Sequence, residues 1–228
     1  MRHVFALLFF LFPINLLSEI EESLIVTESN WFFLPSIDEI KQEEIEFYNA
    51  HHFKELLNLS SGVWISRGSG QESLISLRSP VLTGAGACGS FQILEDGIQI
   101  RPAGFCNVNN LFEVAGNLAS DIEVVKGPSS SMFGGNALHG VINVKSINTV
   151  GNSNLNFQVD KNDSIRSKLI YKRIKNTAVG FDFAKDNGFR NRSGFDQQKF
   201  VIKNFKDIED LSLQTLISFT NLNQETAG

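Results

Sequence analysis

The sequence predicts an α+β domain with a small mixed sheet, followed by the first antiparallel strands of a transmembrane β-barrel. Short apolar runs separated by turn residues occupy positions 63–146. Beyond residue 148 the runs lengthen to about ten residues and alternate apolar with polar side chains, a pattern typical of barrel strands. A leader of the secretory kind opens the chain, which fits a destination outside the cytoplasm.

Composition favours an ordinary folded protein and gives no sign of a nucleic-acid partner. The 228 residues are 42% hydrophobic and carry a formal net charge of -5. Such a chain has no broad basic field to attract phosphates, so we expect no nucleic acid among its partners. Phenylalanine is unusually frequent, with 20 residues against two Tyr and two Trp. Most of these rings stand singly among polar residues, which indicates alternating strands.

Residues 1–18 have the anatomy of a signal peptide. The segment MRHVFALLFFLFPINLLS places Arg2 and His3 before an apolar run that is too short to span a bilayer comfortably, and the polar Glu19 follows. A buried N-terminal helix is the alternative. Export would expose the two cysteines to an oxidising compartment, where an even count favours one disulfide.

Residues 19–35 are predicted to be a flexible, mostly polar arm. It contains one short extended patch, from Leu24 to Thr27, and it ends at Pro35. Ser36 and Glu39 have the spacing of a capping box, so we expect a helix to begin at Ser36. A second short helix is expected from about His51 to Leu59. Because His51 and His52 are adjacent, they point in different directions on a helix, and surface or capping roles are favoured over metal binding.

From Val63 onward the pattern changes to short strands. Five segments read as strands: VWISR, SLISLRS, FQILEDGIQI, DIEVVKG and GVINVKS. Within the third, Asp96 and Gly97 lie between apolar runs and form a strong two-residue hairpin signal. This part of the chain is therefore expected to form an α+β unit with a small sheet.

The last part of the chain, residues 148–228, is expected to contribute about five barrel strands. The segments are NLNFQVD, SIRSKLIYKR, TAVGFDFAKD, QKFVIKNFKD and LSLQTLISFTNL. A soluble antiparallel sheet would show the same period of two, so that alternative stays open. In lipid no strand edge can remain unpaired, and the smallest barrels of this kind need about eight strands. We therefore expect the chain to be a fragment of a longer protein.

Residues 36–147 resemble the plug domain of TonB-dependent outer-membrane receptors. The run DIEVVKGPSSSMFGGNALHGVINV, Asp121 to Val144, follows the family pattern closely, after SLISLRS and a strand that ends in Asp-Gly. Lys126 stands where the family usually has Arg, Phe133 where it has Tyr, and Ser79 where a Gly follows Arg78. The residues that carry the resemblance are Arg78, Asp96, Gly97, Glu123, Lys126, Gly127, Pro128, Gly134, Gly140 and Asn143.

Independently of the resemblance, Glu123 and Lys126 are charged residues in otherwise apolar strands. In a plug we expect them to face the barrel wall and form ion pairs there. A solvated sheet face is the alternative.

The resemblance implies a gated importer in the outer membrane of a Gram-negative bacterium. The implied partners are the inner-membrane protein TonB, outer-membrane lipid and a small scarce nutrient, a ferric chelate being the commonest in the family, and the implied oligomeric state is a monomer. The arm carries a segment like the family's TonB box, which can add as a strand to a partner's sheet edge. Its residues are Leu24, Ile25, Val26, Thr27, Glu28 and Ser29. A disordered leader with chance β-branched residues is the alternative.

Two other classes of function fit the sequence less well. The glycines at 84, 86 and 89 spell the letters of a dinucleotide-binding loop, but Pro80 precedes them and a strand follows them, so no helix is available to hold a pyrophosphate. A structural or adhesive outer-membrane protein would be expected to lack plug motifs and an arm. The sequence offers no catalytic, cofactor or metal site, and His139 is expected to have a structural role.

Cys88 and Cys106 are predicted to form a disulfide. They lie eight residues before Asp96 and nine after Gly97, so a hairpin folded at that turn brings them nearly opposite each other. The bond would close a loop of 19 residues and stabilise the domain by about 3 kcal/mol. In a plug these loops lie on the side where ligand arrives. The resemblance therefore implies apical, ligand-facing positions for Gly84, Gly86, Arg101, Phe105 and Asn107.

Overall fold

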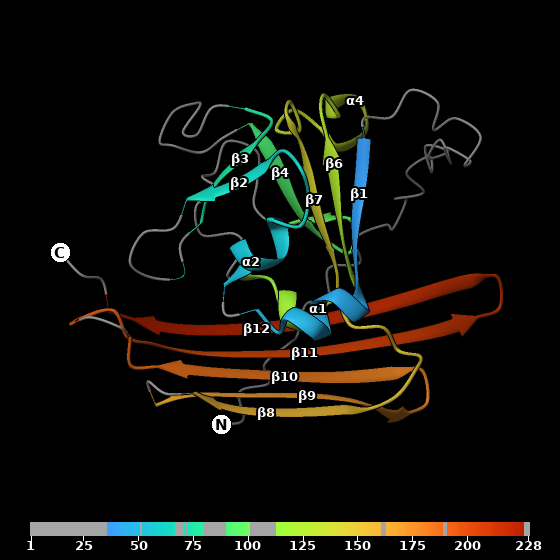
Figure 1. Ribbon diagram of the computed structural model, residues 1–228. Helices are drawn as coiled ribbons and strands as arrows, with labels where there is room; N and C mark the ends of the chain where they lie inside the picture. Colours follow the sequence, from blue (N-terminus) through green and yellow to red (C-terminus); the bar gives the residue numbers. More distant parts are fainter. Residues whose placement is uncertain are drawn as a thin grey trace, which may run out of the picture. The chain divides into compact units, whose positions relative to one another are not determined.

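The computed structural model describes residues 36–50, 52–66, 71, 73–79, 90–100, 113–160, 163–188 and 191–225, and all of these belong to one compact unit. Two regions follow each other along the chain (Figure 1). The N-terminal domain runs from β1 to β7, and the long sheet comprises β8 to β12. The helical elements are α1 Gln42–Tyr48, α2 Phe53–Leu57, the 3-10 turn η3 Gly116–Leu118 and α4 Ser130–Phe133.

The N-terminal domain is built on a five-stranded mixed sheet, as the sequence predicts. Its strand order is β1-β6-β7-β4-β5, in which β4 and β7 run parallel and all other neighbours are antiparallel. A separate hairpin pairs β2 with β3. The strands are β1 Ser36–Lys41, β2 Val63–Ser66, β3 Leu74–Leu77, β4 Phe91–Glu95, β5 Ile98–Gln99, β6 Asp121–Lys126 and β7 Gly140–Lys145.

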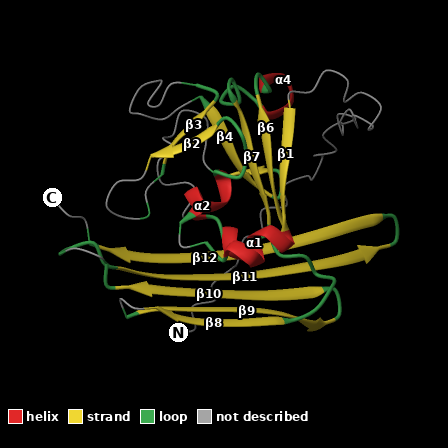
Figure 2. Cartoon of the chain, in the orientation of Figure 1, coloured by secondary structure: helices red, strands yellow, loops and turns green. Residues whose placement is uncertain are grey.

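The core of this domain lies between the mixed sheet, α1, α2 and the β2–β3 hairpin (Figure 2). The alternate apolar residues of β6 and β7 are fully buried in it, because both strands sit inside the sheet with neighbours on each side. The buried set includes Ile40, Ile45, Leu56, Leu57, Ile65, Leu77, Phe91, Ile122, Val124, Ile142 and Val144. Burial of this many aliphatic side chains accounts for the stability of a sheet made of such short strands.

The expected helix start at Ser36 is wrong, because residues 36–41 form β1 and pair with β6. The helix begins at Gln42 instead. There the backbone N–H of Lys41 donates to the carboxylate of Glu44 at 2.9 Å. This is one of the two hydrogen bonds of a capping box, and it forms five residues after the position that the sequence predicted. Pairing with an existing strand overrode the local capping signal. His52 caps α2 by accepting from Lys54 N at 3.0 Å, in line with the capping role predicted for it.

The long sheet contains the five predicted strands in sequential antiparallel order, β8 to β12. Their bounds are β8 Asn154–Asp160, β9 Ser164–Ile174, β10 Thr177–Asp186, β11 Phe195–Ile208 and β12 Leu211–Gln224. Tight connections join β9 to β10 and β11 to β12, and Asn176 and Glu209 adopt positive φ in them. Within the described ranges, no helix is long and apolar enough to cross a membrane.

Candidate functional site

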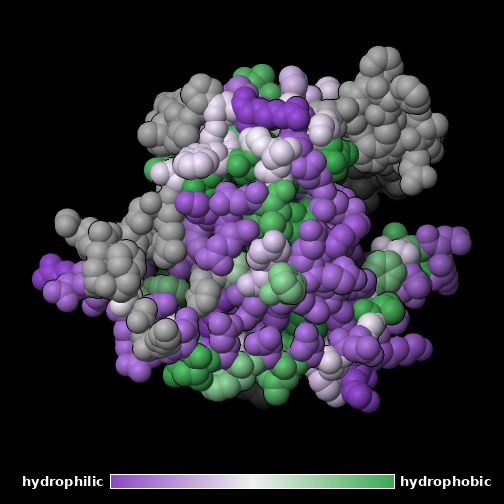
Figure 3. Space-filling view, in the orientation of Figure 1, coloured by the Kyte–Doolittle hydropathy of each residue, from purple (hydrophilic) through white to green (hydrophobic). Residues whose placement is uncertain are grey.

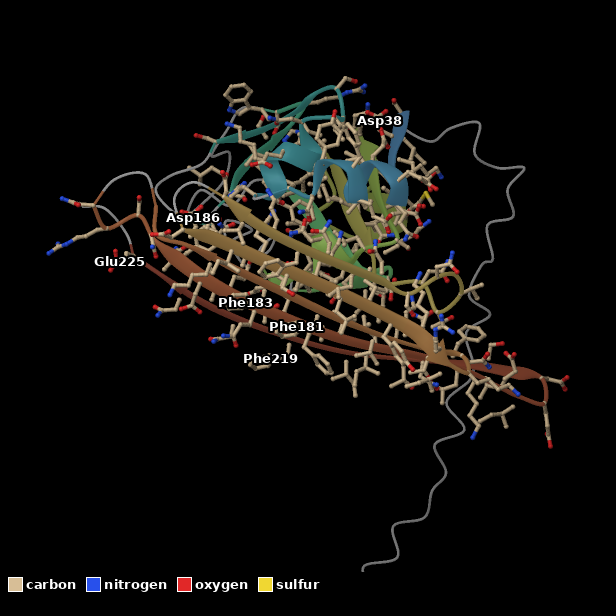
Figure 4. All side chains as sticks on the ribbon, turned by 60° about the horizontal axis from the view of Figure 1, so that its bottom comes forward. Asp38, Phe181, Phe183, Asp186, Phe219 and Glu225 are labelled. Atoms are coloured by element: carbon tan, nitrogen blue, oxygen red, sulfur yellow. The ribbon has the colours of Figure 1, made fainter. Side chains whose placement is uncertain are left out.

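The two faces of the long sheet differ sharply in chemistry. On one face, side chains from all five strands align in register as Leu155, Leu169, Phe181, Phe200 and Phe219. This face is solvent-accessible, with Leu155 70% and Phe219 60% exposed. Figure 3 shows hydrophobic side chains gathered at the lower edge of the view, over the long sheet, and Figure 4 shows Phe181, Phe183 and Phe219 projecting from the sheet. A sheet in water would bury this face, whereas a membrane strand turns it to lipid.

The opposite face, here called the inner face, is polar and covered by the N-terminal domain. One row in register reads Asn156, Lys168, Asp182, Lys199 and Thr220. Lys168, Asp182 and Lys199 are each no more than 5% exposed. Charges at this depth need partners, and the N-terminal domain supplies them.

Cationic side chains of the inner face bind backbone carbonyls of the N-terminal domain. Lys199 Nζ donates to Val114 O at 2.6 Å, and Lys168 Nζ lies 3.5 Å from Asn117 O. The guanidinium of Arg166 donates to the carbonyls of Asn49 and Ala50, just beyond the C-terminus of α1. Cations are favoured at the end of a helix, where carbonyls lack intrahelical partners. Side chains of the long sheet therefore bind the N-terminal domain through the backbone carbonyls of that domain.

An apolar socket interrupts the polar inner face. Leu118 of η3 packs there against Gly180, where an added Cβ would lie 3.0 Å from Leu118 Cδ1. The buried cluster around it consists of Ala115, Leu118, Ile147, Ile170, Ala178 and Val201, with Leu216 packed against it. Ala178 and Gly180 on β10 have small side chains or none, which leaves the space that Leu118 fills. The contact is therefore both complementary in shape and apolar on both sides.

Asp96 is a second point of attachment. Its carboxylate accepts from Ser146 N at 2.9 Å, from Lys203 Nζ of β11 at 3.1 Å and from Gln214 Nε2 of β12 at 3.1 Å. The predicted Asp96–Gly97 turn is confirmed, since Leu94 and Glu95 pair with Gln99 and Ile98 across it. Burial, and then the charge of neighbouring Asp96, raise the pKa of Glu95.

The charged signature residues pair inside the N-terminal domain, which differs from the expected ion pairs at the barrel wall. Lys126 is 2% exposed and donates to Asp38 of β1 at 2.5 Å. Asp38 also accepts from Ser60 Oγ at 2.7 Å. The hydrogen bond from Lys126, followed by that from Ser60, lowers the pKa of Asp38. The difference arises from the register between β1 and β6. Lys126 lies opposite Ser36, so its side chain contacts residues of β1 and does not extend to the barrel wall.

Glu123 pairs with Lys145 and accepts from Asn143 Nδ2 at 3.0 Å. The side chain of Asn143 in turn accepts from Gly97 N at 2.9 Å, so three signature residues form one network across β6, β7 and the β4–β5 turn. The signature glycines allow close approach of main chains. Gly140 has φ 147°, and a Cβ there would overlap Val125 O.

The remaining signature residues serve turns. Gly127 and Gly134 have positive φ, on either side of Pro128 and α4. Arg78 adopts φ 47° next to Ser79, and its side chain lies against Gly62. Ser79 therefore does not need glycine's freedom, because the unusual backbone angle falls on Arg78.

Several predicted site residues lie outside the described residues. These are the disulfide pair Cys88 and Cys106, the TonB-box-like segment Leu24 to Ser29, and the apical positions Gly84, Gly86, Arg101, Phe105 and Asn107. His51, for which a surface or capping role was expected, lies outside them as well. Their roles stay predictions. Among the residues that the structure does describe, no group of three or more His, Cys, Asp or Glu side chains could hold a metal ion.

Sequence reasoning did not single out the inner-face charges as a site. Arg166 and Lys168 counted only as the polar half of an alternating strand, and Asp182 and Lys199 were not assigned a role. The available signal was the charge of residues on strands whose other face carries the apolar row Leu155, Leu169, Phe181, Phe200 and Phe219. Their partners, the backbone carbonyls of Val114 and Asn117, cannot be identified from a sequence pattern, because every residue has a backbone carbonyl.

Comparisons with known proteins agree with this architecture. Residues 34–141 match the family model described as TonB-dependent Receptor Plug Domain. The chain is 28% identical over 165 residues to the vitamin B12 transporter BtuB of Vibrio vulnificus, which corresponds to 69% of this chain and 26% of that protein.

Solved structures show the same fold at low identity. The unliganded ferric citrate transporter FecA superposes with a TM-score of 0.64 at 16% identity, covering 88% of this chain and 33% of that one. The hemophore receptor HasR of Serratia marcescens, solved with its hemophore and heme, gives 0.60 at 13% identity, covering 83% and 32%. The chain thus spans about a quarter to a third of the length of these relatives.

Proposed function

We propose that the chain is part of a TonB-dependent importer in the outer membrane of a Gram-negative bacterium, because residues 34–141 match the family model of the TonB-dependent receptor plug domain. In this proposal the long sheet is the first part of the barrel wall and the N-terminal domain is the plug. One observation carries the proposal: the inner face of the long sheet binds the N-terminal domain through buried charges, while the outer face is apolar.

The energy for import would come from the proton-motive force through TonB. The segment Leu24 to Ser29 is rich in β-branched residues and suits strand addition to a sheet edge of TonB. The arm that carries it leads into β1, an edge strand of the plug with β6 as its neighbour. A pull on the arm would therefore act on β1 first, and the plug would rearrange to open a path.

We propose a ferric chelate as the nutrient. FecA is named as a ferric citrate transporter, FyuA of Yersinia pestis as a ferric yersiniabactin uptake receptor and PirA of Pseudomonas aeruginosa as a siderophore receptor. Vitamin B12 is the competing candidate, because BtuB is the relative found by sequence. The loops around Cys88 and Cys106 would form part of the ligand floor, pinned by their disulfide.

The orientation follows from connection length. Barrels of this kind have short periplasmic turns and longer outer loops, so the tight β9–β10 and β11–β12 turns would face the periplasm. The opposite end carries the longer β10–β11 connection and a hollow of about 210 Å³ whose lining includes Asp186 and Glu225, labelled in Figure 4. Ligand would arrive from that end.

Uptake by the complete receptor tests the proposal. Cells lacking their own receptors would be given labelled ferric siderophores or cobalamin, with and without TonB. We expect uptake that needs TonB, and we expect Val26→Pro to abolish uptake but keep ligand binding, because proline removes a main-chain donor from the added strand. Glu21→Pro, outside the segment, is the matched control. Binding without energised uptake in any variant would favour a structural or adhesive protein instead.

A further inference from the structure

We propose that the long sheet carries a binding site for the phosphate of an anionic phospholipid. The site lies at the step where the β11–β12 hairpin extends beyond the β9–β10 turn. The inference rests on the proposed function in one respect, because it takes the outer face of the sheet to lie in the outer membrane. It goes further by naming a lipid ligand and the groups that bind it.

The step exists because the β11–β12 hairpin is longer than its neighbour. The β10–β11 ladder ends at Thr177 and Asn204, whereas β11 continues to Ile208 and there pairs only with β12 among the described strands. Figure 1 shows this hairpin reaching beyond the β9–β10 turn. The step leaves a recess of about 550 Å³, a volume typical of small-molecule sites. Its lining consists of Lys175, Asn176, Asn204, Phe205, Lys206 and Asp207.

A main-chain donor points into the recess. Phe205 N donates to Asn176 O at 2.9 Å, which ties β11 to the β9–β10 turn. Because the N–H groups of an antiparallel strand point alternately to its two sides, the N–H of Asp207 points the same way as that of Phe205. No described residue of β10 lies opposite Asp207. This N–H is therefore available to an anionic ligand.

Two ammonium groups border the recess and can pair with a phosphate. Lys175 and Lys206 are exposed, and neither has an ion-pair partner among the residues that the structure describes. The carboxylate that lines the recess, that of Asp207, accepts from Ser212 Oγ at 2.7 Å. Successive side chains of a strand point to opposite faces, so this carboxylate and the ammonium of Lys206 lie on different sides of the sheet. The outer side of the recess is therefore cationic.

The apolar surroundings of Lys206 favour a lipid over a soluble phosphate. Leu213 is its register partner on β12, and Ile208 and Leu211 form the next pair on the same face. The exposed fractions of Leu213, Ile208 and Leu211 are 46%, 43% and 64%. A soluble anion gains nothing from these side chains, whereas acyl chains would cover them. The site therefore fits an amphiphile whose phosphate enters the recess and whose chains lie against the hairpin.

The level of the site agrees with a lipid headgroup. In the proposed orientation the tight turns face the periplasm, so the lipid would come from the periplasmic leaflet. Lys175 directly follows β9, and Lys206 lies close to the end of β11. Lysine side chains near a membrane border cover apolar surface with their stems and extend their charge toward the headgroups.

Native mass spectrometry of the full receptor tests the site. The receptor would be purified in detergent and incubated with phosphatidylglycerol. We expect a retained lipid, and we expect Lys175→Gln with Lys206→Gln to lower the retained fraction at least fivefold. Lys175→Arg with Lys206→Arg should keep retention within twofold of wild type, because both charges remain. Lys185→Gln is the matched control and should change nothing, since this exposed lysine lies at the other end of the sheet, opposite Asp196.

Two further arms separate a lipid from a free anion. Leu211→Gln with Leu213→Gln should lower retention of the lipid, because the acyl chains lose their contacts. Millimolar inorganic phosphate should leave the lipid bound. Displacement by phosphate, or retention unchanged by the paired glutamine substitutions at Lys175 and Lys206, would overturn the inference. Unheated gels would establish that each variant compared is folded.

The measurement needs neither TonB nor a nutrient, so it separates this inference from the proposed function. Energised uptake by a receptor that retains no lipid at the step would overturn this inference alone. Retention at the step by a receptor without TonB-dependent uptake would overturn the proposed function alone.

Discussion

Lys199 on β11 donates a hydrogen bond to the carbonyl of Val114 at 2.6 Å, and its register partner on β10 is Asp182. One buried ammonium thus binds the long sheet to the main chain of the N-terminal domain, and it lies beside the residue that carries a carboxylate on the neighbouring strand. Because every residue has a main-chain carbonyl, this hydrogen bond constrains the path of the backbone at residues 113–119 and sets no requirement on the side chain of residue 114.

Lys199→Met should weaken the attachment of the plug. The methionine keeps much of the volume but leaves Val114 O without its donor, at a cost of about 1–3 kcal/mol. We expect a lower thermal midpoint in detergent and faster proteolysis between residues 113 and 119. Lys185→Met, on the exposed side of β10, is the control and should change neither. An unchanged midpoint for both variants would contradict the role of Lys199.

Leu118→Ala should empty the socket on the inner face. Replacing a fully buried leucine by alanine costs about 2–5 kcal/mol, depending on how far the site collapses, and Leu118 is 1% exposed. Leu155→Ala is the matched control, because that side chain is 70% exposed. Denaturant unfolding of both variants measures the difference. Equal losses would show that the socket adds nothing beyond an exposed leucine.

Gly140→Ala should destabilise the plug sheet. The glycine has φ 147°, and a methyl group would overlap the carbonyl oxygen of Val125 on β6. Gly135→Ala provides a control in the same signature run, because no atom lies within 4 Å of the added carbon there. We expect poor accumulation of the first variant in the outer membrane and normal accumulation of the second. Normal levels of both would show that β6 and β7 can separate without penalty.

Asp38→Asn should destabilise the β1–β6 pair at neutral pH, by about 1–3 kcal/mol for a hydrogen bond to a charged group. The pKa of Asp38 is lowered in the folded protein by Lys126 and Ser60, so the folded state binds fewer protons than the unfolded chain. This stabilisation is present above the ordinary value of 3.8 and is lost as pH falls through the lowered value.

The difference between wild type and Asp38→Asn should therefore shrink below about pH 4. Unfolding at pH 7 and in acid measures it. Glu39→Gln is the control on the same strand, because its partner Lys41 is largely exposed and the pair contributes little. A pH-independent difference would mean that Asp38 acts by shape and not by charge.

Phe219→Arg should impair membrane assembly. The ring belongs to the apolar row that crosses all five strands, and an arginine on the lipid face costs about 2–4 kcal/mol at mid-depth. Lys206→Arg, near the end of β11, keeps its charge and should assemble normally. The folded fraction on unheated gels reports assembly. Full assembly of Phe219→Arg would mean that this face does not meet lipid.

The alternation of the strands in the long sheet could be predicted from the sequence, and the N-terminal domain resembles the plug domain of TonB-dependent receptors. The roles of Gly127, Pro128, Gly134 and Gly140 could be predicted from the sequence, because glycine and proline act on the local backbone conformation. The period of two in β8 to β12 likewise predicts two chemically distinct faces. The Asp96–Gly97 turn needs only its two residues to be recognised.

The strand at residues 36–41 and the partners of the buried charges depend on contacts between distant parts of the chain. A capping-box spacing predicted a helix at Ser36. In the structure these residues pair with β6 as a strand, and this long-range pairing outweighs the local helix preference. Alternation could mark Lys199 as facing inward but not name its partner, because Val114 O is separated from it by 85 residues and is a main-chain atom. Contacts of this kind depend on how two domains meet, which no local pattern encodes.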